Sequence, residues 1–140
     1  MGYEVKMFIV RRRKDQDDGW CHVLGMVDLS KPGPNSSVVS LVQEYQAVSK
    51  SFEQDKRPFI YESLGENENE ISEDKYGDPL ALIPAREFMD ALEEDNKKCQ
   101  AADGHTYRRF DMAIALLGSV FKCQGWQGAL DTIFVLTYGH

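Results

Sequence analysis

The sequence predicts an α+β domain, with a mixed, largely antiparallel sheet of about four to five strands packed with three helices. Short apolar segments with the alternation of β-strands lie near both ends of the chain. Three longer segments place apolar residues at spacings of three and four, as amphipathic helices do. The predicted order is β-β-α-β, an acidic loop, then β-α-α-β. A length of 140 residues fits one domain, which we expect to span residues 1–140.

The N-terminal third predicts a β-hairpin followed by a helix. Residues 3–12 alternate in strand fashion, and a turn that ends in Asp18-Gly19 precedes a second strand over 20–29. These two strands should therefore pair antiparallel. One of residues 35–37 caps the helix that follows. Its apolar stripe consists of Val38, Leu41, Val42, Tyr45, Val48 and Phe52.

The C-terminal half predicts two strands and two helices. Residues 79–83 form a short buried strand, and Pro84 fits the first turn of the next helix. A third helix over 106–122 is apolar around much of its circumference, so we expect it to be the most buried helix. The unbroken apolar run over 132–138 predicts an interior strand that is covered on both faces.

The charge of the chain is concentrated between Glu62 and Asp78. This stretch holds seven acids and a single base, a net charge of −6, while the whole chain carries −7. It follows a short strand candidate over 57–63, in which Pro58 suggests a sheet edge. With almost no apolar residues, residues 62–78 are expected to form a long exposed loop, and such loops are usually functional or disordered.

This acidic stretch suggests a small non-enzymatic interaction protein: an adaptor, inhibitor or regulator of a partner protein with a basic surface. Aromatic residues near both ends of the stretch would complete a binding patch. They could equally anchor the ends of the loop. The candidate partner-binding residues are Glu66, Glu68, Glu70, Glu73, Asp74, Tyr61 and Tyr76.

A polar cluster at the start of the third predicted helix suggests an alternative, a small enzyme or ligand-binding protein. A helix N-terminus favours anions, so a pocket there could use His105, Arg108, Arg109 and Asp111. A structural interpretation is a helix cap made by Asp103 or Thr106. Asp111, if buried, would then take a donor from Arg108 or Tyr107. A second alternative is a structural or virion component that forms a homo-oligomer.

Several classes of function find no support in the sequence. No nucleotide-binding or hydrolase motif is present, so we assign no catalytic residues and no cofactor. The three histidines and three cysteines lack the short spacings of metal ligands, and we expect no metal. A pI near 4.9 disfavours direct nucleic-acid binding. No apolar run is long enough for a membrane helix, and we expect a cytoplasmic protein with no membrane contact.

Overall fold

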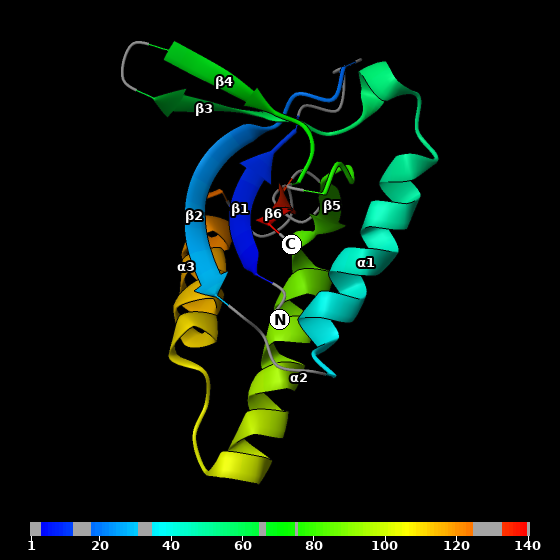
Figure 1. Ribbon diagram of the computed structural model, residues 1–140. Coiled ribbons are helices and arrows are strands. Elements are labelled where there is room, and N and C mark those ends of the chain that lie inside the picture. The colour runs from blue at the N-terminus through cyan, green and yellow to red at the C-terminus, as the bar shows by residue number, and fades with distance from the viewer. Residues whose placement is uncertain are drawn as a thin grey trace.

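The computed structural model describes residues 4–12, 18–30, 35–64, 67–74, 76–124 and 133–139. In this part of the chain three helices pack with a four-stranded and a two-stranded antiparallel sheet, which confirms the predicted α+β class (Figure 1). None of the helices in the described ranges has the length and apolar character needed to cross a membrane.

The larger sheet has the strand order β2-β1-β6-β5. Strands β1 (Val5–Arg11) and β2 (His22–Ser30) form the predicted antiparallel hairpin. Strand β6 (Ile133–Gly139) lies between β1 and the short strand β5 (Ala81–Pro84), so the prediction of an interior strand at the C-terminal end is confirmed.

The alternation of side chains in β1 builds a core on each face of this sheet. Val5, Met7 and Ile9 are buried in the larger cluster, together with residues from all three long helices. Phe8 and Val10 belong to a smaller cluster on the opposite face. The smaller cluster also holds residues from outside the larger sheet: Cys21, Ile60 and Leu80, with Ile71 packed against them.

The helices α1 (Ser37–Lys50), α2 (Ala85–Asp103) and α3 (Arg108–Gln124) form one layer on the larger cluster. Figure 1 shows α3 behind β2 and α1 beyond β5, with α2 between them. The expectation that the third helix is the most buried is wrong. Because α2 contacts both α1 and α3, it buries seven residues, against four recorded for α3: Phe110, Ala113, Leu117 and Phe121.

The smaller sheet is a hairpin of β3 (Ile60–Leu64) and β4 (Asn67–Ile71), which projects from one end of the molecule (Figure 1). Much of the acidic stretch that we expected to be a loop is therefore paired strand. The pair forms because Ile60 and Ile71 lie opposite each other at its base and pack in the smaller cluster. We call residues 60–78 of this projecting region the acidic arm.

Candidate partner-binding surface

The acidic arm joins the body of the protein at Phe59. Phe59 N donates to Gly19 O, and Cys21 N donates to Phe59 O, both at 2.9 Å. A side chain at position 19 would meet the Arg57 carbonyl oxygen at 1.8 Å, so this close approach of two backbones requires glycine. The base of the arm is thus fixed to the segment that leads into β2.

Asp74 closes the turn that ends the arm. Its Oδ1 accepts from the backbone N–H groups of Tyr76 at 2.9 Å and Asp78 at 3.0 Å, and its Oδ2 accepts from Gln46 Nε2 at 3.0 Å. Gly77 completes the turn with a φ of 80°. Asp74 is only 8% exposed. The expectation that Asp74 is an exposed partner-binding acid is therefore wrong, because its carboxylate accepts hydrogen bonds from the turn and from α1.

Four other candidate residues present their side chains to solvent. Tyr61 is 48% exposed and Tyr76 is 69% exposed. Glu70 pairs with Tyr61 across the hairpin and is exposed, as is Glu73 just beyond β4. The structure thus brings two acids and an aromatic side chain onto one part of the arm, which supports a mixed surface.

Two further candidates have less structural detail. The backbone of Glu68 lies in β4 opposite Ser63. Glu66 lies outside the described residues. Both remain candidates on the strength of their charge and their place in the arm.

Two hollows flank the arm. The first hollow lies between the short 3-10 helix η1 (Gln54–Lys56) and the hairpin, and it is lined by Gln54, Asp55, Arg57, Phe59, Glu70, Ser72 and Glu73. The second hollow lies between α1 and the turn, and it is lined by Gln43, Gln46, Ala47, Lys50, Asp74, Tyr76 and Asp78.

The two hollows differ in the state of their acids. In the second hollow Asp78 forms an ion pair of 3.0 Å with Lys50, and both carboxylate oxygens of Asp74 accept the hydrogen bonds described above. Around the first hollow the carboxylates of Asp55, Glu70 and Glu73 have no hydrogen bond or ion pair with any described residue. The first hollow therefore gathers three acids without a partner among the described residues, whereas the acids of the second hollow are paired.

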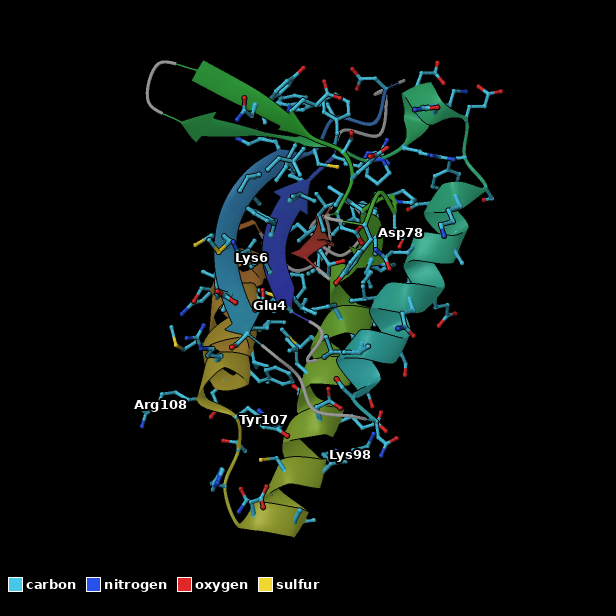
Figure 2. The ribbon with its side chains drawn as sticks, viewed as in Figure 1. Glu4, Lys6, Asp78, Lys98, Tyr107 and Arg108 are labelled. Carbon is cyan, nitrogen blue, oxygen red and sulfur yellow. The ribbon has the colours of Figure 1, made fainter. Side chains whose placement is uncertain are left out.

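The residues proposed for the alternative pocket at 105–111 contact different parts of the structure. His105 Nδ1 lies 3.2 Å from Thr106 O and 3.9 Å from Cys99 Sγ. Arg109 Nη1 donates to Asp28 O at 3.0 Å on strand β2. Figure 2 shows Arg108 extending away from the fold. These contacts suit the connection of two helices better than a common binding site.

Asp111 belongs to this connection as well. We expected its donor to be Arg108 or Tyr107, and this expectation is wrong. Its Oδ1 accepts from Asn96 Nδ2 at 2.9 Å, and its Oδ2 accepts from Thr106 Oγ1 at 2.6 Å. One donor therefore comes from α2, which packs against α3, and the other from the connection just before α3.

Sequence reasoning missed the buried polar residues of α2. Asp95 is 4% exposed and accepts from Ser36 Oγ at 2.6 Å, Ser37 N at 2.7 Å and Val38 N at 3.2 Å. It thereby satisfies the free N–H groups at the start of α1 from a neighbouring helix. A signal was present, because Asp95 falls in the apolar row that runs through Phe88, Leu92 and Cys99.

The buried Cys21 is not an activated thiol. Burial raises the pKa of the Cys21 thiol from 9.0 to about 11, so it is protonated at neutral pH. Cys99 is buried and Cys123 is exposed, and all three cysteines are free. No group of three potential metal ligands comes together among the residues that the structure describes.

Comparison of the chain with models of protein families, with curated proteins and with solved structures finds no match. The function has therefore to be argued from the geometry and charge described above.

Proposed function

We propose that this chain is a non-enzymatic interaction protein, an adaptor, inhibitor or regulator, whose acidic arm docks on the basic surface of a partner protein. The observation that carries the proposal is the placement of the charge. The stretch 62–78 holds a net charge of −6 out of −7, and much of it lies in a hairpin that projects from the body. An acidic projection is drawn to a positive surface, which speeds encounter and aligns the two proteins.

The aromatic residues of the arm support this function. Tyr61 and Tyr76 are exposed, although large aromatic side chains are normally drawn into a core. Tyrosine is enriched at the centres of protein interfaces because it combines apolar area with a hydroxyl group. A surface that combines acids with exposed tyrosines therefore fits a protein partner better than a small ion.

The proposal includes a cytoplasmic location. Cys21, Cys99 and Cys123 are free, and free thiols are typical of a reducing compartment. No observation favours the enzyme alternative in the same way, since the residues at 105–111 take separate structural contacts.

The test is capture of partners from the native host by the full chain, identified by mass spectrometry. We would compare the wild-type chain with an arm variant in which Glu66, Glu68, Glu70 and Glu73 are all changed to Gln. Asp74 is left intact because it holds the turn. A control variant neutralises four exposed acids of the helices instead: Glu44, Asp90, Glu93 and Glu94.

We expect a stoichiometric basic partner on the wild-type chain and on the control variant, and its loss from the arm variant. Equal capture of that partner by a folded arm variant would show that the arm does not recruit it.

A further inference from the structure

We propose that the first hollow receives an arginine side chain from the partner protein. This inference rests on the proposed function, because it names the contact through which the acidic arm would recognise a basic partner. It assigns to one small site the specificity that a diffuse negative surface lacks.

The hollow lies where three segments of chain meet. Asp55 comes from η1, Phe59 leads into β3, and Glu70 and Glu73 come from the end of β4 and the residues after it. Its volume of ≈ 170 Å³ is more than ten times the roughly 10–15 Å³ that a single water molecule requires. The site therefore has room for a long side chain as well as for solvent.

The charges of the wall select a cation. Three carboxylates line the hollow, and none has a hydrogen-bond or ion-pair partner among the described residues. The base in the wall, Arg57, offsets only part of this charge, since three acids face one base, and its Nη2 donates to Lys50 O at 3.2 Å. The second hollow shows the contrast, since there Lys50 already pairs with Asp78.

The aromatic residue of the wall, Phe59, favours arginine. The ring of Phe59 packs edge to face with that of Tyr61, with centroids 5.4 Å apart, and this contact holds the Phe59 ring in place beside the hollow. A guanidinium group stacks on aromatic rings while its N–H groups bind carboxylates.

A pair of peptide probes tests the site directly. The full chain, labelled with ¹⁵N, is titrated with acetyl-Gly-Arg-Gly-amide and separately with acetyl-Gly-citrulline-Gly-amide, which has nearly the same shape and no charge. We expect saturable amide shifts with the arginine peptide, centred on residues 54–59 and 70–73. The citrulline peptide should leave these amides unmoved.

A matched pair of variants separates the hollow from the general charge of the protein. Glu70→Gln combined with Glu73→Gln should weaken binding of the arginine peptide about three- to tenfold, as the loss of two exposed ion pairs predicts. Glu44→Gln combined with Glu93→Gln changes the net charge equally on the helices and should leave binding within about twofold of the wild type.

Three results would overturn the arginine site: shifts centred elsewhere, equal binding of the citrulline peptide, or equal weakening by the two variants. A failure of the proposed function looks different. If the captured partner is lost with Glu66→Gln and Glu68→Gln but keeps its affinity with Glu70→Gln and Glu73→Gln, the arm recruits the partner and the arginine site is wrong. If the peptide binds as expected while the arm variant still captures its partner, the arginine site is confirmed and the proposed docking function is wrong.

Discussion

Two buried acids that bind α1 from other segments show how single residues hold this fold together. Asp95 caps the start of α1 from α2, and Asp74 joins the arm to α1 through Gln46. Both carboxylates lie out of solvent, where an unpaired charge would be costly. The sequence marked Asp95 by its apolar neighbours in the helix. The burial of Asp74 could not be predicted in this way, because two of its three donors are backbone groups of a turn.

Asp95→Ala should lower the free energy of unfolding by about 2–4 kcal/mol, because it leaves a buried hydroxyl and two backbone N–H groups without an acceptor. Chemical denaturation measures this change. Asp90→Ala, an exposed acid on the same helix, is the control and should cost less than about 0.5 kcal/mol. Equal effects of the two substitutions would remove the capping role from Asp95.

Cys21 should make stability depend on pH in alkaline solution. Its pKa is raised by burial to about 11 from 9.0, so the folded state favours the protonated thiol. The contribution is complete below about pH 9 and is lost as pH rises toward 11, because the unfolded chain ionises first. The two-unit shift corresponds to roughly 2–3 kcal/mol.

Denaturation of the wild type and of Cys21→Ala across this pH range tests the expectation. The advantage of the wild type should shrink between about pH 9 and pH 11. A constant difference between the two proteins would mean that the thiol does not titrate differently on unfolding.

At the scale of elements, the main sheet and the helices could be predicted and the acidic hairpin could not. Strands with clear alternation and helices with an apolar stripe can be recognised because the period of their apolar residues marks the face that will be buried. Strand β4 reads Asn-Glu-Asn-Glu-Ile, and asparagine and glutamate are poor strand formers. Its pairing depends on Ile60 and Ile71 reaching a cluster built by distant segments, which local sequence does not reveal.

This dependence predicts a gradient of stability between the two sheets. A lone two-stranded hairpin is marginal in water, whereas β6 is paired on both sides. Amide hydrogen exchange should therefore be faster at 67–71 than at 133–137. Equal protection of the two strands would mean that the arm is as firmly held as the centre of the main sheet.

At the scale of the whole molecule, a nearly neutral body carries a negatively charged projection. The α+β class and the concentration of acid at 62–78 could both be predicted from sequence, because each is a sum over many residues. The positions of the arm, its hollows and its paired and unpaired acids could not, since they depend on which segments meet. Because the exposed acids of the arm contribute little to stability, neutralising them should leave the fold intact.

The most direct test of the docking function is the salt dependence of partner binding. The purified partner is titrated with the wild-type chain, the arm variant and the control variant at ionic strengths from about 0.05 M to about 0.5 M. We expect the affinity of the wild type and the control variant to fall steeply with salt, because exposed charges are screened, and the arm variant to bind weakly with little dependence on salt. Parallel salt curves of equal affinity for the wild type and the arm variant would contradict the account.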